Sequence, residues 1–229
     1  ENLPQVHTVL CALRELVALA APSTIFKAEA IVPPDLLTGY LGAGVPERNE
    51  CELAYNNQLM VLLWSRLATS GTTDQPRVDA SGDARLMTTS LQRMATIPDH
   101  TCWVNYVRCH DDIGWAITDE DAATVGWSGP THRNFLNEFY SGAFDLSFAR
   151  GEVFQYNPVT GDGRISGSAA SLCGIELARA SGDAAALEEA CARLELVYAT
   201  VFAFTGLPLL YMGDELGLLN DADWDAVPD

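Results

Sequence analysis

Basic side chains are scarce in this sequence. It carries 13 Lys and Arg residues against 31 Asp and Glu residues, which gives a formal net charge of −18 at pH 7. A surface this acidic repels phosphate groups, so nucleic acid and anionic membranes are excluded as partners. The charge favours a soluble protein with a neutral small substrate, although an acidic surface also serves solubility alone.

Long apolar runs, zinc motifs and targeting segments are lacking as well. No run reaches the roughly 18 apolar residues that a membrane span needs, and the first residues open into helix-like sequence rather than a signal peptide. The cysteines show no CxxC or zinc spacing, which predicts reduced thiols in the core, a cytoplasmic setting and no metal site. They are Cys11, Cys51, Cys102, Cys109, Cys173 and Cys191.

The most informative segments are three apolar runs that end in acidic residues. Their ends carry Glu29, the pair Asp111 and Asp112, and the pair Asp214 and Glu215. Continuous apolarity suits strands covered on both faces of a parallel sheet, and a parallel α/β barrel builds its active site at the carboxyl ends of such strands. A core strand capped by a solvated acid is the alternative for any one run, but three runs in one chain favour a shared catalytic rim.

Helical periodicity fills the intervals between the predicted strands. The helix predicted over residues 3–20 has Arg14 outside its apolar stripe, which consists of Val6, Val9, Leu10, Leu13, Leu16 and Val17. Other helices are expected over residues 33–40, 58–68, 84–94 and 184–204, and a short strand over 53–55. The order of elements predicts an α/β protein with a parallel sheet, about strands five to eight of a (β/α)8 TIM barrel.

This regularity breaks between residues 113 and 182, where no further βα repeat occurs. Long irregular segments in compact domains are functional lids or small subdomains. We therefore predict an inserted subdomain over 113–182, between barrel parts at 1–112 and 183–229. The insertion is rich in aromatic side chains, which suit sugar rings or form a core of their own: Trp115, Trp127, Phe135, Phe139, Tyr140, Phe144, Phe148, Phe154 and Tyr156.

Several motifs in the chain resemble those of one enzyme family. They are FKAEAIV at 26–32, QLM at 58–60, NYVRCHDDIGW at 105–115, SFARG at 147–151, FQYNP at 154–158, TGD at 160–162, RISG at 164–167 and MGDE at 212–215. Over essentially its whole length the chain resembles amylosucrases, the sucrose glucosyltransferases of the α-amylase superfamily. The resemblance implies a retaining mechanism with two carboxylates, sucrose and an α-1,4-glucan acceptor as ligands, and no cofactor.

The resemblance also assigns roles to residues at the strand ends. It implies that Glu29 is the general acid/base, which protonates the departing fructose and then deprotonates the acceptor hydroxyl. Asp111 would bind sugar hydroxyls and stabilise the oxocarbenium-like transition state, and His110 would donate a hydrogen bond to the same glucosyl ring. The alternative for His110 is a histidine that only serves the barrel core.

Three further residues match family positions on the acceptor or sucrose side of the pocket. They are Asp112, Arg133 and Arg164. An arginine in a loop is often a surface or ion-pair residue, so that alternative stands beside the binding role for both arginines.

One feature of the family has no counterpart in this sequence. Its nucleophile is an Asp at the end of the fourth barrel strand, preceded by a characteristic Arg, and no residue here fits that motif. We therefore expect a fragment of a glucosyltransferase that cannot complete the reaction alone. A sucrose hydrolase or another α-glucosidase of the superfamily is the alternative among enzymes, and a noncatalytic glucan-binding relative is the alternative outside them. The sequence leaves the oligomeric state open.

Overall fold

The computed structural model describes residues 3–30, 32–42, 50–69, 84–94, 96–221 and 223. The first half of the chain contains α1 (Pro4–Ala20), β1 (Lys27–Ala28), α2 (Pro34–Leu37), the 3₁₀ helix η1 (Thr38–Leu41), β2 (Leu53–Tyr55), α3 (Asn57–Thr69), α4 (Arg85–Gln92) and β3 (Cys102–Tyr106). The second half contains β4 (Ile113–Gly114), α5 (Asp119–Thr124), α6 (Gly129–Tyr140), β5 (Glu152–Phe154), β6 (Arg164–Ser166), α7 (Ala169–Leu172), α8 (Ile175–Ser181), α9 (Ala184–Ala203), β7 (Leu207–Leu209) and η2 (Asp214–Leu216).

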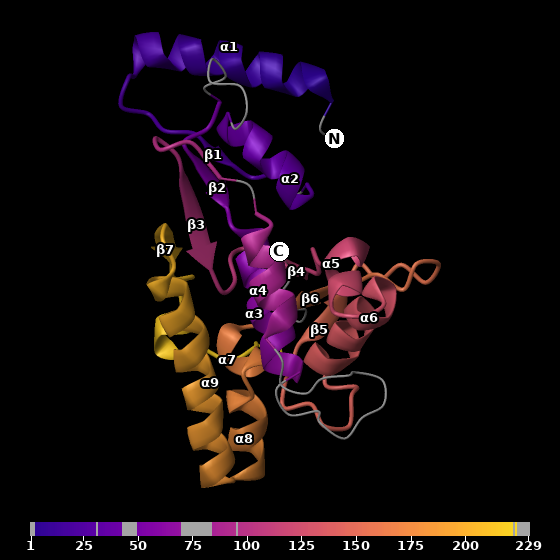
Figure 1. The fold of residues 1–229 in the computed structure, drawn as a ribbon. Coiled ribbons are helices and arrows are strands. Elements are labelled where there is room, and N and C mark those ends of the chain that lie inside the picture. The colour runs from indigo at the N-terminus through magenta and orange to yellow at the C-terminus, as the bar shows by residue number, and fades with distance from the viewer. Residues whose placement is uncertain are drawn as a thin grey trace.

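A parallel sheet of four strands, in the order β1-β2-β3-β7, positions the candidate site. Every neighbouring pair in it is parallel, so the carboxyl ends of these strands meet at the same edge (Figure 1). Strand β2 coincides with the strand predicted over 53–55, and β1, β3 and β7 belong to the three apolar runs that end in acidic residues. The α/β class is confirmed. The two outer strands of the sheet are partly exposed: Lys27 in β1 and Leu207 in β7 are both open to solvent.

Two buried asparagines tie the central strands together. The side chain of Asn56, just after β2, donates from Nδ2 to Oδ1 of Asn105 in β3 at 2.9 Å. The Oδ1 atom of Asn56 also accepts from the backbone N–H of Leu59, which caps the first turn of α3. Asn105 in turn donates to the carbonyl of Thr205, and Gly206 follows with a φ of 144° at a point where a Cβ would lie 2.6 Å from a β3 carbonyl. A glycine is therefore needed where the chain turns into β7.

Helix α3 forms the centre of the hydrophobic core, as its apolar sequence predicted. Leu59, Leu62 and Trp64 are completely or almost completely buried. The indole N–H of Trp64 donates to the carbonyl of Val107 after β3, and the carbonyl of Trp64 accepts from the Tyr140 hydroxyl in α6. Hydrogen bonds at both polar groups allow this large residue to be buried without an unsatisfied donor or acceptor. The helix thus joins the sheet to the inserted segment.

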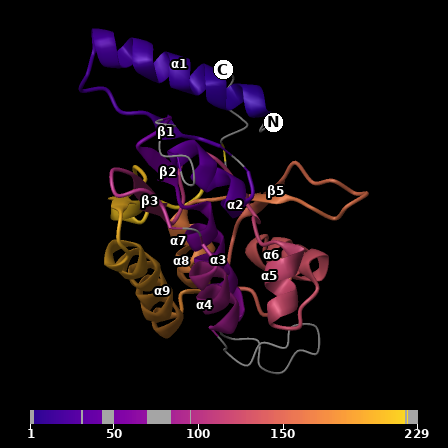
Figure 2. The same cartoon turned by 45° about the horizontal axis from the view of Figure 1, so that its top comes forward.

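The inserted segment contains a second, antiparallel sheet in the order β4-β6-β5. Helices α5 and α6 lie on one side of α3 and α4, and α9 lies on the other, while the β5–β6 hairpin projects from the body of the molecule (Figure 2). Most of the aromatic side chains of the segment, including Phe139 and Tyr140, belong to the same core as α3. Phe154 and Tyr156 on the hairpin are exposed instead, so their rings are open to a ligand.

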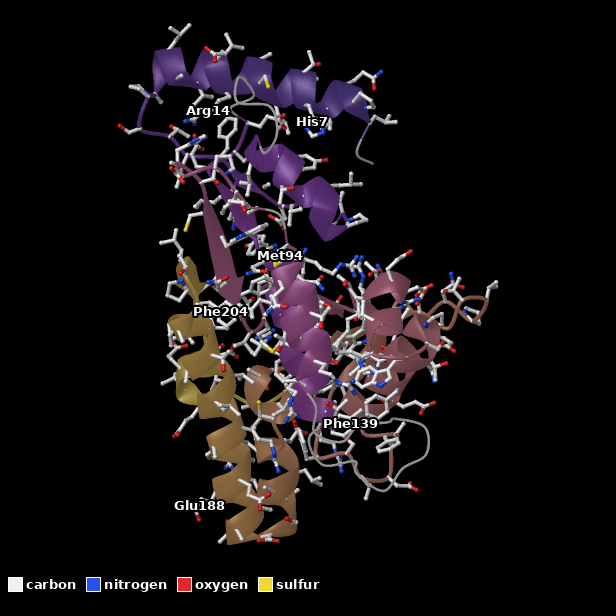
Figure 3. All side chains as sticks on the ribbon, in the orientation of Figure 1. His7, Arg14, Met94, Phe139, Glu188 and Phe204 are labelled. Carbon is white, nitrogen blue, oxygen red and sulfur yellow. The ribbon has the colours of Figure 1, made fainter. Side chains whose placement is uncertain are left out.

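The orientation predicted for the first helix is only partly correct, because Val6 and Leu10 of the expected apolar stripe pack against the core around Leu37 and Tyr40. Val9, Leu13 and Leu16 of the expected apolar stripe are exposed, whereas Arg14, expected outside it, points toward the body of the molecule (Figure 3). Arg14 pairs with Glu52 and His7 lies 2.7 Å from Glu50. A buried carboxylate without a partner costs several kcal/mol, more than an exposed leucine does. The two ion pairs and the packing of Val6 and Leu10 together therefore favour the same inward face of α1.

The cysteines are free thiols, and Cys51, Cys109 and Cys173 are buried as predicted. The prediction of a core position is wrong for Cys191, which is exposed, and for Cys11 and Cys102, which are partly exposed. Within the described parts of the chain, no helix combines the length and apolarity required to cross a membrane.

Acidification is expected to destabilise the fold through His132 in α6. Burial first, and then the charge of Arg133, lowers the pKa of His132 to about 4, and its Nε2 lies 2.8 Å from the Ser65 hydroxyl. The unfolded chain takes up this proton near pH 6.5, so the free energy of unfolding should fall between pH 6.5 and about 4, by about 3 kcal/mol. Denaturant titrations over this range measure the loss. His132→Gln should remove that part of the pH dependence, and His100→Gln, at an exposed histidine, should leave it unchanged.

Candidate functional site

Two strand ends bring the predicted catalytic residues together. Glu29 follows β1 directly, and His110 and Asp111 lie in the loop that follows β3. Oε1 of Glu29 lies 3.0 Å from Nε2 of His110, and Oδ2 of Asp111 lies 4.0 Å from the same nitrogen. The parallel sheet causes this meeting, because residues 82 positions apart in the sequence share one edge (111 − 29 = 82). The three side chains are 49%, 53% and 47% exposed for Glu29, His110 and Asp111, so a ligand can reach them.

The cavity beside these residues, here called the carboxylate pocket, has a volume of about 70 Å³. Glu29, Asp111, Asp112 and Arg164 contribute its charged lining together with Arg108. The volume is below the roughly 300–1,000 Å³ of small-molecule sites, so the carboxylate pocket alone holds only part of a ligand. A larger ligand must extend into the neighbouring hollows.

Two larger cavities share walls with the carboxylate pocket. The arginine pocket, of about 460 Å³, includes Arg164 and Arg133. The Asp214 pocket, of about 830 Å³, includes Asp112 and Asp214. Arg164 lines both the carboxylate pocket and the arginine pocket, and Asp112 lines both the carboxylate pocket and the Asp214 pocket. Both volumes lie in the usual range of small-molecule sites.

The two predicted arginines differ in how their guanidinium groups are used. Arg133 donates to Asp119 at 2.8 Å, to Asp162 at 3.1 Å and to the carbonyl of Ile117 at 2.9 Å. Burial works to lower the pKa of Arg133, but the hydrogen bonds to Asp119 and Asp162 outweigh it and raise the pKa above its ordinary value. These contacts agree with the ion-pair alternative for Arg133. Within the described residues the side chain of Arg164 makes no hydrogen bond or ion pair, which leaves its guanidinium donors available to a ligand.

Asp214, the third acid predicted at a strand end, has a different environment from Glu29 and Asp111. It is buried, accepts a hydrogen bond from the Tyr198 hydroxyl and lies 3.5 Å from Nη1 of Arg108. Burial, and then the hydrogen bond to Asp214, raises the pKa of Tyr198, so its hydroxyl keeps its proton. The carboxylate of Glu215 accepts from the backbone N–H of Gly213. Asp214 therefore anchors the end of β7 rather than joining the Glu29 cluster.

Several groups around the carboxylate pocket were not identified from the sequence. The Tyr106 hydroxyl donates to Asn57 at 2.5 Å, and burial raises the pKa of Tyr106. Arg108 pairs with Asp214 while its guanidinium lies 4.5 Å from the ring centre of Tyr211. Burial also raises the pKa of Cys109, the residue before His110. Their position at the end of β3 was the available signal, because side chains that follow adjacent parallel strands meet at one edge.

A scan of the chain against protein-family models gives no match. A pair of carboxylates beside an imidazole can exchange protons with a ligand, and a guanidinium with free donors can bind hydroxyl or other oxygen acceptors. These groups suit a polar, oxygen-rich ligand.

Proposed function

We propose that this chain is part of an amylosucrase-like glucosyltransferase, which cleaves sucrose, transfers glucose to an α-1,4-glucan and releases fructose. The observation that carries the proposal is the meeting of Glu29 with His110 and Asp111 at the carboxyl edge of the parallel sheet. These are the residues to which the sequence resemblance gives the central roles. The proposal includes the fold, in which β1, β2, β3 and β7 are strands five to eight of a (β/α)8 barrel.

In the proposed reaction each of these residues has a separate role. Glu29, in its protonated form, gives its proton to the glycosidic oxygen as fructose leaves, and a carboxylate nucleophile takes the anomeric carbon. The Glu29 carboxylate then accepts the proton of the acceptor's hydroxyl as that oxygen attacks the glucosyl group. Asp111 supports the positive charge that develops on the ring, and His110 binds a ring hydroxyl. No residue of this chain matches the nucleophile, so the complete reaction needs a group from outside it.

The cavities suggest how the ligands would be divided. The carboxylate pocket, with about 70 Å³, suits the reacting end of the sugar, and the arginine pocket, with about 460 Å³, suits the acceptor. Arg164 lies between the two with free donors, and Asp112 lines the opposite opening. Arg133 would act by holding the arginine pocket in shape through Asp119 and Asp162. A cytoplasmic location is part of the proposal and fits the free cysteines.

Substitution of the two arginines is expected to distinguish acceptor binding by Arg164 from structural support of the arginine pocket by Arg133. In a protein that contains this chain and its nucleophile, Arg164→Ala should shift the products from glucan toward glucose and short sugars, with sucrose consumption less affected. Arg133→Ala should instead lower the free energy of unfolding by about 1 kcal/mol or less, because its ion pairs are largely solvent-exposed. Product chromatography and denaturant unfolding measure the two effects. Unchanged products in both variants would remove both arginines from acceptor binding.

A noncatalytic glucan-binding protein is the second candidate function. The absence of a residue matching the nucleophile favours it, since binding needs no nucleophile. Calorimetry with maltoheptaose and sucrose, together with an assay for fructose, distinguishes the candidates. Fructose release by a protein carrying this chain supports the transferase, provided that glucan rather than free glucose accumulates. Free glucose alone would favour a sucrose hydrolase, and oligosaccharide binding without any turnover would favour the noncatalytic role.

A further inference from the structure

Three consecutive residues after β3 bring together different metal-binding groups. One ligand atom from each of Cys109, His110 and Asp111 lies within 4.8 Å of the other two. A fourth group is close, because Oε1 of Glu29 lies 3.0 Å from Nε2 of His110. Thiolate sulfur, imidazole nitrogen and carboxylate oxygen are the three kinds of ligand that zinc takes in proteins.

We propose that this cluster binds a zinc ion, with Cys109, His110 and Asp111 as ligands and Glu29 beside the fourth coordination position. The cysteine spacing gave no sign of such a site, because a search for CxxC pairs overlooks a cysteine whose partners are the next two residues and a glutamate 80 positions earlier (109 − 29 = 80). The cluster exists only because β1 and β3 end at the same edge of the sheet.

The geometry requires only small movements of the side chains. Zinc bonds of about 2.0–2.3 Å in a tetrahedral site hold the ligand atoms roughly 3.3–3.8 Å apart. The ligand atoms of the cluster lie within 4.8 Å of one another, so closing around the ion moves them by about 1 Å. The side chains of His110 and Asp111 are about half exposed, which leaves room for this movement. Cys109 is buried and lines the carboxylate pocket, so it supplies a fixed point around which the other two close.

The charges around the cluster favour a cation, and its ligand types favour zinc. Glu29, Asp111 and Asp112 all line the carboxylate pocket, and the chain carries a net charge of −18. Of the two arginines that line the same pocket, Arg108 is already paired with Asp214. Magnesium and calcium select sites made of oxygen ligands, whereas thiolate and imidazole select zinc and its neighbours among the transition metals. Zinc should therefore bind at concentrations at which magnesium does not.

Zinc binding would affect the proposed reaction directly. An ion held by Asp111 and His110 occupies the groups assigned to the glucosyl ring and lies against Glu29, so zinc and sugar would exclude each other. This consequence rests on the proposed function, whereas the binding of zinc itself does not.

Calorimetry on the metal-stripped 229-residue chain, without any sugar, tests the proposal. Zinc chloride should bind to one site per chain, and both His110→Ala and Cys109→Ser should weaken the affinity by about tenfold or more, because even supporting groups of metal ligands contribute that much. His100→Ala and Cys191→Ser remove an exposed histidine and an exposed cysteine elsewhere, and should change the affinity less than about twofold. Circular dichroism verifies that each variant keeps its fold.

Cobalt provides a second measurement that depends on the thiolate alone. Co²⁺ bound to the chain should give a sulfur-to-metal charge-transfer absorption, and Cys109→Ser should abolish it while Cys191→Ser retains it. Zinc affinity that is unchanged in His110→Ala and Cys109→Ser, or magnesium binding as tight as zinc binding, would overturn the proposal. Because no sugar is present in either measurement, such a result would leave the proposed function standing, and a failure to act on sucrose would leave the zinc site standing.

Discussion

Glu29→Gln is expected to lower the rate of fructose release from sucrose by about 10²–10⁴-fold, in a protein that carries this chain and its nucleophile. Glutamine keeps the size and the hydrogen-bonding oxygen of the side chain, but it can neither give a proton to the glycosidic oxygen nor take one from the acceptor. Because Glu29 lies beside His110, the glutamine variant tests proton transfer without removing the polar contact to the imidazole. A polar group of the same shape remains 3.0 Å from the imidazole, so the geometry of the cluster should survive.

A second glutamate provides the matched control. Glu188 lies on α9, at the end of the molecule away from α1 (Figure 3), and is exposed. Glu188→Gln removes the same charge without touching the pocket, so its initial rate should equal that of the unmodified protein. Initial rates of fructose release at saturating sucrose, with thermal unfolding of each variant, measure the effect. A Glu29→Gln protein with activity within a few-fold of the unmodified protein would exclude Glu29 as the acid/base.

Elements built from local apolar pattern could be predicted from the sequence. Helix α3 is buried on nearly all sides, as its continuous apolar composition indicates, and β3 and β7 lie within the runs predicted for them. The meeting of Glu29 with His110 and Asp111 could also be predicted, because it follows from parallel strands whose carboxyl ends share an edge. In both cases one short stretch of sequence, or one rule of sheet geometry, contains the necessary information.

Features that depend on distant partners could not be predicted. The inward position of His7 and Arg14 in α1 depends on their ion pairs with Glu50 and Glu52, which lie far along the chain. The role of Arg133 likewise depends on Asp162, across the β5–β6 hairpin. An apolar stripe or a motif match describes one segment, whereas the free energy of an ion pair depends on two segments and on their burial.

Self-association of the 229-residue chain is the second large effect expected. Strands β1 and β7 each have a neighbouring strand on one side only among the described residues. Leu207 in β7 is 49% exposed, and Leu196 and Phe202 in the preceding helix α9 are 59% and 55% exposed. Open strand edges flanked by apolar side chains pair with other chains. Size-exclusion chromatography should therefore show oligomers or aggregates, and because no residue matches the nucleophile, the chain alone should release no fructose from sucrose.

Two lysine substitutions distinguish strand pairing at the β7 edge from nonspecific association. Leu207→Lys places a charge on the β7 edge, where it should hinder strand pairing and shift the chain toward smaller species at the same concentration. Val159→Lys adds the same charge at a fully open position on the β5–β6 hairpin and should leave the elution unchanged. Light scattering of the eluting peaks measures the mass of each species. Equal shifts in both variants would mean that net charge, not the β7 edge, governs association, and a monomer that turns over sucrose would contradict the assignment of the nucleophile to a group outside this chain.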